Sequence, residues 1–143
     1  MTVSDNIELV RRITERGLND GDLSFAEDVF SADYEVHTRG LDLPRGADAF
    51  RAAVNFWRQA FPDFHTTIQQ MLGEGEYVVN RFTTHGTHTE PLGEIPPTGK
   101  QFEVSGVDLH RVVDGKVVES WISDDFPRIL MEIGALRPAG GPH

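Results

Sequence analysis

The chain has 143 residues, no cysteine and a formal net charge of −10, from 13 Lys+Arg against 23 Asp+Glu. This length suits a single domain, which we expect over residues 1–136, followed by a flexible Pro- and Gly-rich tail over 137–143. The lack of cysteine excludes disulfides and thiolate chemistry, and the negative charge disfavours nucleic acid and membrane surfaces as partners. No apolar run approaches the ~20 residues of a membrane span and no signal peptide is recognisable, so we expect a cytoplasmic protein.

The first half of the chain has helical periodicity. Ser4–Asp20 carries apolar residues with the spacing of one helical face, and Ser4 is its expected N-cap. A short helix capped by Asp22 should follow, and Tyr34–Thr38 should be extended. The strongest helical pattern lies in Gly46–Phe61, whose apolar stripe is typical of a core and also of a cavity wall. This stripe consists of Ala49, Phe50, Ala53, Val54, Trp57, Ala60 and Phe61.

From His65 onward the apolar period changes to two, which is typical of β-strands. Turns are expected at Gly73–Gly75 and Asp114–Gly115, and the loop 89–99 has too many prolines and glycines for a regular element. Helices followed by long antiparallel strands indicate the α+β class, with a curved sheet wrapped around helices and an internal pocket. The expected strands are His65–Met71, Glu76–His88, Lys100–Val112 and Lys116–Ser123, and the last helix is Phe126–Ile133.

The turn at Asp114–Gly115 decides which side chains meet across the last hairpin. A two-residue loop would place Asp108 opposite Trp121, whereas a three-residue loop would place it opposite Ser120. We expect the three-residue loop, because a residue followed by Asp-Gly-Lys suits a type I turn with a bulge. In that register one face carries Gly106, Asp108, His110, Ser120, Ile122 and Asp124.

Both faces of this hairpin are partly apolar. Val118 and Ile122 would point to one face, and Val117 and Trp121 to the other. A second buried face indicates one of two covers: the C-terminal helix, or a second copy of the chain in a homodimer or tetramer. Both alternatives stay open.

Asp108 and His110 are the best candidates for acid–base chemistry. They lie two residues apart on one strand, and therefore on one face of a sheet that should be concave. A carboxylate or imidazole among apolar groups has a shifted pKa and can move protons near neutral pH, although a structural hydrogen bond would use the same residues. Arg81 lies in mid-strand and needs a partner or a ligand. Asp124 or Asp125 should cap the last helix.

Metal and nucleotide sites are disfavoured. His85 and His88 should point to opposite faces of their strand, and no Cys/His cluster completes a set of metal ligands. The sequence contains no phosphate-binding glycine loop and no nucleophile elbow. We therefore expect no metal and no other cofactor.

Short motifs from Asn6 to Leu136 carry a family resemblance over nearly the whole chain. They are Asn19–Leu23 (NDGDL), Asp33 and Tyr34 with His37, Ala60–Phe64 (AFPDF), Arg81 and Phe82, Gly86–His88 (GTH), Ile95–Gly99 (IPPTG), Asp114–Glu119 (DGKVVE), Trp121, Asp125, and Ile133 with Gly134. In this order they resemble the SnoaL-like polyketide cyclases, or ester cyclases, of the NTF2-like superfamily. The resemblance implies a cone-shaped α+β barrel, usually oligomeric, that closes a ring in a hydrophobic polyketide by intramolecular aldol chemistry, with an acid/base pair and no cofactor.

The resemblance also places the family's catalytic Asp on Ile122, which cannot move a proton, and its active-site His on Asp108. Asp108 would then be the base, with His110 or Asp124 as its partner. The expected substrate-binding residues are His37, Phe50, Val54, Trp57, Phe61, Arg81, His85, Ser120 and Ile122. Two alternatives stay open. One is a non-catalytic protein that binds a small hydrophobic molecule, which Ile122 favours. The other is an enzyme of epoxide hydrolase, isomerase or hydroxylase type on the same scaffold, for which Arg81 is available.

Overall fold

The computed structural model describes residues 2–137, so the expected tail lies outside the described residues except for Arg137. The helices are α1 (Val3–Arg12), the π-helical segment η1 (Ile13–Asn19) that continues it, α2 (Ala26–Val29), α3 (Ala47–Ala60) and α4 (Phe126–Glu132). The strands are β1 (Phe30–His37), β2 (His65–Glu74), β3 (Tyr77–Thr87), β4 (Gln101–Val113) and β5 (Lys116–Ser123). Each expected helix and strand therefore has a counterpart, with boundaries shifted by a few residues.

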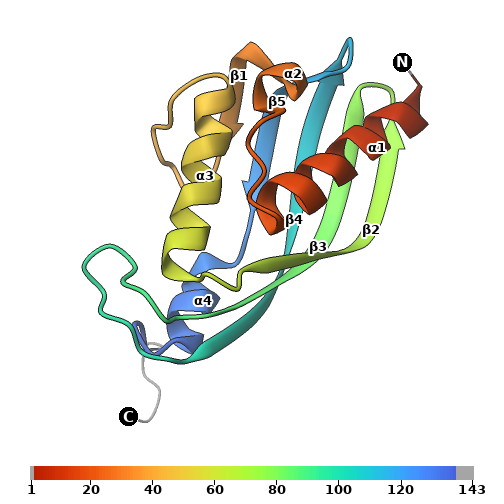
Figure 1. The fold of residues 1–143 in the computed structure, drawn as a ribbon. Coiled ribbons are helices and arrows are strands. Elements are labelled where there is room, and N and C mark those ends of the chain that lie inside the picture. Colours follow the sequence, from red (N-terminus) through yellow and green to blue (C-terminus); the bar gives the residue numbers. More distant parts are fainter. Residues whose placement is uncertain (1, 138–143) are drawn as a thin grey trace.

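The five strands form one curved sheet in the order β1-β5-β4-β3-β2. Strands β2 to β5 are the expected antiparallel meander. Strand β1 adds a parallel edge next to β5, whereas the sequence indicates only an extended segment at this place. The pairing of β1 with β5 is irregular between Phe30 and Glu35. Helices α1 and α3 lie on the concave face and α4 lies at one end of the sheet (Figure 1). The α+β fold with a curved sheet wrapped around helices is confirmed; the sheet is open, with β1 and β2 as its edges.

The N-terminal helix begins earlier than expected and changes its winding part-way. Thr2, not Ser4, is the N-cap: its side chain accepts a hydrogen bond from the backbone N–H of Asp5 (3.1 Å), whose carboxylate accepts one from the Thr2 N–H (2.9 Å). From Ile13 the helix is π-helical. Such segments are frequent at functional sites, and this one contributes three residues to the cavity described below.

The hairpin between β4 and β5 has a two-residue turn. Val113 pairs with Lys116, and the turn residues Asp114 and Gly115 both have positive φ, 51° and 77°. This combination is typical of a type I′ turn, which matches the right-handed twist of the strands. The expected three-residue loop is therefore wrong.

A bulge in β5 follows the turn and restores the expected face. Val112 pairs with Val117 but Arg111 pairs with Glu119, so Val118 is an extra residue. The bulge shifts all later pairs by one, so the expected partner of Asp108 is also wrong: Asp108 lies opposite Ile122, and Ser120 lies opposite His110. The even-numbered residues still share one face, as predicted, since the shorter turn and the extra residue compensate.

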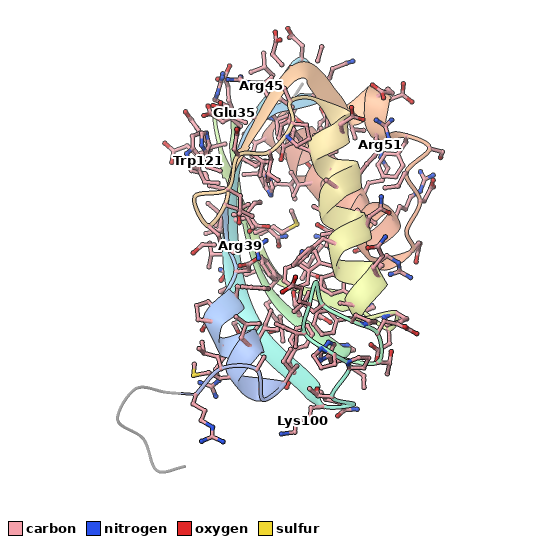
Figure 2. The ribbon with its side chains drawn as sticks, turned by 90° about the vertical axis from the view of Figure 1, so that its left-hand side faces the viewer. Glu35, Arg39, Arg45, Arg51, Lys100 and Trp121 are labelled. Carbon is pink, nitrogen blue, oxygen red and sulfur yellow. The ribbon has the colours of Figure 1, made fainter. Side chains whose placement is uncertain are left out.

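Trp121 lies on the outer face of the sheet. It is 36% exposed and stacks on His37 with ring centroids 5.5 Å apart. Figure 2 shows it on the side of the sheet away from α3. Helix α4 packs instead around Ile129, in a cluster at the other face, so the prediction that it covers Trp121 is wrong. Val117, expected beside Trp121, is buried in the core, because the bulge turns it inward. A second copy of the chain over this face stays a prediction.

None of the helices in residues 2–137 combines the length and the apolar character that a membrane crossing requires.

Candidate functional site

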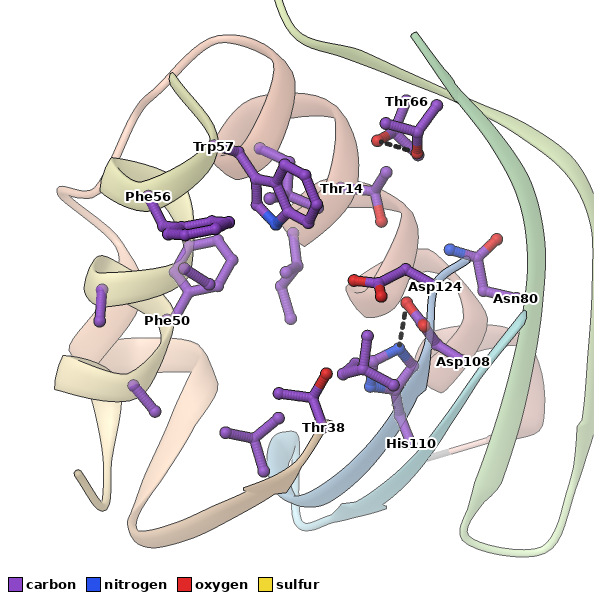
Figure 3. Close-up of a pocket in the computed structure, with 18 of the residues that line it drawn as sticks. Thr14, Thr38, Phe50, Phe56, Trp57, Thr66, Asn80, Asp108, His110 and Asp124 are labelled. Carbon is purple, nitrogen blue, oxygen red and sulfur yellow. Dashed lines mark hydrogen bonds and ion pairs between the residues drawn. The ribbon is translucent and has the colours of Figure 1, made fainter. Parts of the chain in front are cut away.

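A cavity of about 330 Å³ lies between the concave face of the sheet and the helical segments η1 and α3 (Figure 3). Its size falls within the range of roughly 300–1,000 Å³ that is typical of small-molecule sites. The helical wall is apolar: Phe50, Phe56 and Trp57 of α3 line it, together with Ile13 and Leu18 of η1. Such a wall suits a hydrophobic or aromatic ligand.

The opposite wall, formed by the sheet, carries ionisable groups. Asp108 and His110 project from β4, and Asp124 directly follows β5 (Figure 3). Nε2 of His110 lies 3.9 Å from Oδ2 of Asp108, and Nδ1 of His110 forms a hydrogen bond of 2.6 Å with Oγ of Ser120. Oδ1 of Asp108 and Oδ1 of Asp124 are buried without a hydrogen-bond partner among the described residues. An unpaired buried acceptor costs about 1–3 kcal/mol, so both oxygens are open to a ligand.

The three ionisable groups have shifted pKa values. Burial raises the pKa of Asp108 well above its usual range and the nearby charge of Asp124 raises it further, while the backbone N–H of Ser123 acts in the opposite direction. Burial also raises the pKa of Asp124, and the positive charge of Arg39 partly offsets this rise. Burial lowers the pKa of His110 to about 4, so its imidazole is neutral at pH 7. Both carboxyls therefore favour the protonated form more than an exposed aspartate does, and the effect is stronger for Asp108 than for Asp124.

Arg39 is the one permanently cationic residue among the described residues that line the cavity. It adopts a left-handed φ of 50° in the segment between β1 and α3. Its guanidinium carbon lies 4.4 Å from the ring centroid of Phe126 and 5.4 Å from that of Phe56. These cation–π contacts hold the charge on the side of the cavity where Asp124 lies.

The buried hydroxyl of Ser120 holds His110 in place. Ser120 is fully buried, does not line the cavity and holds the imidazole through its hydroxyl. Tyr34 of β1 is also buried; burial raises the pKa of its phenol, and the hydroxyl of Ser120 and the carboxylate of Asp108 both act on it. The hydroxyl of Ser120 therefore fixes the orientation of His110. Tyr34 itself lines the cavity.

The structure brings together some of the substrate-binding residues expected from the sequence. Phe50, Trp57 and Ile122 line the cavity, whereas Val54 and Phe61 are buried in the core and do not line it. Ser120 lies behind His110 rather than in the wall.

Three further expectations are corrected, because their side chains point to the outer face. Arg81 and His85 are exposed on β3, since the inward residues of this strand are the even-numbered ones. Nε of Arg81 donates to Oε1 of Gln70 (3.4 Å) on the neighbouring strand. Nε2 of His37 lies 2.7 Å from Oε2 of Glu119, outside the cavity.

The described residues contain one His/Asp/Glu group compact enough to hold a metal ion, Glu35–His37–Glu119. It lies on the outer face, and the guanidinium of Arg45 already forms an ion pair of 2.7 Å with Glu35 (Figure 2). The group is remote from the cavity lining, so it plays no part in the site.

Sequence reasoning missed several polar residues of the cavity, among them Tyr34, Arg39 and Asn80. Asn80 is 2% exposed and lies on β3 directly opposite Asp108. The alternation of β3, in which Val78 and Phe82 are apolar and Arg81 is charged, is a signal that could have placed Asn80 inward. Tyr34 and Arg39 carried no local signal, because their positions depend on the parallel pairing of β1.

The profile of the SnoaL-like polyketide cyclases matches residues 8–133. The chain belongs to the SnoaL-like polyketide cyclase family. Among curated proteins it is similar to the aklanonic acid methyl ester cyclase DnrD of Streptomyces peucetius, at 30% identity over 144 residues that cover 98% of this chain and 94% of the relative.

Solved structures superimpose on most of the chain and agree with the observed fold. TsrD from Streptomyces laurentii superimposes with a TM-score of 0.84 at 24% identity, over 95% of this chain and 99% of that one. An LEH-like epoxide hydrolase from M. tuberculosis superimposes with a TM-score of 0.69 at 13% identity, over 92% of this chain and 90% of that one. Likeness at these identities shows the fold alone. The expected family is therefore confirmed by the profile and by the curated relative.

Proposed function

We propose that this protein is a cofactor-free ester cyclase that closes a ring in a hydrophobic polyketide by intramolecular aldol chemistry. The observation that supports it best is the pair Asp108 and Asp124 on the wall of an apolar cavity, each with one buried and unpaired carboxyl oxygen. The pKa of Asp108 is raised more strongly than that of Asp124, and in this proposal the two carboxyls divide the roles of hydrogen-bond donor and base between them. A methyl ester like the one in the name of DnrD is the substrate class that we propose.

Asp124 is the proposed base, and Asp108 is the proposed donor. The charge of Arg39 favours ionised Asp124, whereas burial and the Asp124 charge keep Asp108 protonated. This assignment reverses the roles expected from the sequence. Ile122 lies opposite Asp108, and its apolar side chain adds to the desolvation that keeps this carboxyl neutral.

The proposed reaction balances without an oxidant or a cofactor. The Asp124 carboxylate removes a proton from the carbon next to the ester carbonyl, and the C–H electron pair forms an enolate. The enolate carbon attacks a ketone carbon of the same molecule, a C–C bond forms, and the ketone oxygen becomes an alkoxide. The proton on Asp124 then passes to this alkoxide, so the product is an isomer of the substrate. Neutral His110, held by Ser120, fills the wall beside Asp108 and takes no proton.

The proposal is tested by supplying aklanonic acid methyl ester to the purified protein and following a product of unchanged mass by chromatography and mass spectrometry. Asp124→Asn should reduce kcat by about 10²–10⁴-fold and also abolish exchange of the acidic C–H proton with deuterated water. Asp108→Asn should slow both ring closure and exchange of the C–H proton. Residual exchange should remain, because the introduced amide still donates a hydrogen bond. Asp42→Asn, at an exposed residue that does not line the cavity, is the matched control.

Exchange that persists at the wild-type rate in Asp124→Asn would contradict the base assignment. Tight binding of the ester by the wild-type protein without turnover or exchange would contradict the cyclase and favour the non-catalytic binding protein, the alternative that Ile122 had suggested.

Self-association and a cytoplasmic location also stay proposals. The exposed Trp121 and Val107 on the outer face of the sheet support self-association, which light scattering on the eluting protein tests directly.

A further inference from the structure

Asn80 shares the cavity wall with Asp108. The two residues are direct cross-strand partners on β3 and β4, and both side chains point to the concave face. Directly opposed residues of an antiparallel pair have Cβ atoms about 4.5–5.5 Å apart. Polar groups from the two side chains can therefore reach the same ligand atom.

The amide of Asn80 has no structural partner. It is 2% exposed, and its Oδ1 is buried without a hydrogen bond to any described residue. Asn19 behaves differently: its side chain donates to the backbone oxygen of Thr66 (2.8 Å) and accepts from the backbone N–H of the same residue (2.7 Å). A structural amide such as that of Asn19 thus has its hydrogen bonds formed, whereas Oδ1 of Asn80 lacks one, at a cost of about 1–3 kcal/mol in stability.

The donor end of this amide faces the ligand space. Figure 3 shows the nitrogen of Asn80 turned toward Asp124 and the interior of the cavity. The neighbouring hydroxyls are already engaged, because Thr66 and Thr84 bond to each other (3.1 Å) and Thr14 donates to the backbone oxygen of Val10 (3.1 Å). Asn80 is therefore a free neutral donor next to Asp108. Of the described hydroxyls in the lining, that of Thr38 also lacks a partner.

We propose that Asn80 is a catalytic residue whose N–H donates, together with the carboxylic acid of Asp108, to the ester carbonyl oxygen as that oxygen becomes an enolate. The inference rests on the proposed cyclase and deepens it. Negative charge moves from Asp124 to the enolate oxygen, and two donors held on neighbouring strands stabilise it there. When the C–C bond forms, the oxygen returns to a carbonyl and the two hydrogen bonds weaken. Asn80 itself neither gains nor loses a proton.

Kinetics on the ester test this role. Asn80→Leu keeps the size of the side chain and removes the donor, so kcat should fall by about 10²–10³-fold while KM changes much less. Asn6→Leu is the matched control, since Asn6 is also buried with an unpaired Oδ1 but does not line the cavity. Asn80→Val, which also removes the donor and suits a strand, serves as a second variant if Asn80→Leu does not fold, and kcat should fall in the same direction. Asn80→Leu or Asn80→Val with wild-type kcat would overturn the proposal.

A binding measurement separates this inference from the proposed function. In an Asp124→Asn background, which mimics the protonated base, 4-nitrophenolate stands in for the enolate, and 4-nitroanisole is its neutral counterpart. Adding Asn80→Leu should weaken phenolate binding about tenfold or more and leave anisole binding unchanged, whereas a general loss of packing would weaken both. Equal loss for both probes, or for neither, would overturn the inference. If the ester is not turned over but the phenolate preference holds and depends on Asn80, the cyclase fails and the oxyanion site stands.

Discussion

Asp108→Asn should make the protein more stable at neutral pH, although it damages the site. The folded state raises the pKa of Asp108 well above its usual range, mainly through burial. Below the unfolded pKa of about 3.9, both states hold the proton and the group costs nothing. Above this value the unfolded chain ionises first, so stability falls as the pH rises, until the pH passes the folded pKa.

The slope of this loss can be calculated. One group that keeps its proton only in the folded state changes the free energy of unfolding by about 1.4 kcal/mol per pH unit. The amide introduced by Asp108→Asn does not titrate, so the difference in free energy between this variant and wild type should be small at pH 4 and grow with up to this slope above it. For a chain of this length, about 1 kcal/mol corresponds to roughly 3–4 °C in Tm.

Urea unfolding of wild type and Asp108→Asn at half-unit steps from pH 4 to pH 8 measures this difference. Asp42→Asn, at an exposed position, controls for the removal of one negative charge. Asp108→Asn/Asp124→Asn should be non-additive, because the Asp124 charge contributes to the raised pKa of Asp108. A difference that stays flat with pH, or a wild type that gains stability over Asp108→Asn as the pH rises, would refute a protonated Asp108.

Two further outcomes are expected. Burial lowers the pKa of His110 from 6.5 to about 4, so its NMR ring signals should not titrate between pH 8 and 5. Its contribution to stability, about 3 kcal/mol, should be present above pH 6.5 and lost as the pH falls toward 4. An NMR titration midpoint near 6.5 would contradict the lowered pKa. Gly17→Ala should destabilise the fold by about 1–3 kcal/mol in urea unfolding, because the added Cβ would overlap the ring of Phe50. Combining it with Phe50→Leu should recover part of the lost stability. Wild-type stability of Gly17→Ala alone would show that the Phe50 ring moves aside freely.

Local periodicity was enough to predict the helices, the meander and the face shared by Asp108 and His110. The same two-residue alternation could have placed Asn80 inward and Arg81 outward. Both residues are polar, however, and the even-numbered residues of β3 were not identified from the sequence as the inward face. His37 was misplaced for a different reason: its strand pairs in parallel with β5, more than 80 residues away, and nothing in the local pattern specifies that register.

The last hairpin shows how two errors can compensate. The turn was predicted one residue too long, and the extra residue Val118 in β5 was not predicted at all. Either change alone would shift the register by one residue, so that Trp121 would lie opposite Asp108 and point inward. Positions that depend on a bulge or on tertiary contacts, such as Arg39 against Phe126, are not encoded in short-range spacing.

The two walls of the cavity come from different elements of the chain. The apolar wall belongs to η1 and α3, whereas Asn80, Asp108 and Asp124 belong to the sheet and its C-terminal end. Substitutions on the helices can therefore alter the size and shape of the accepted molecule without moving any polar group of the sheet. A scaffold with this division can diversify its substrates by drift on one face while the proton-handling groups on the other stay fixed.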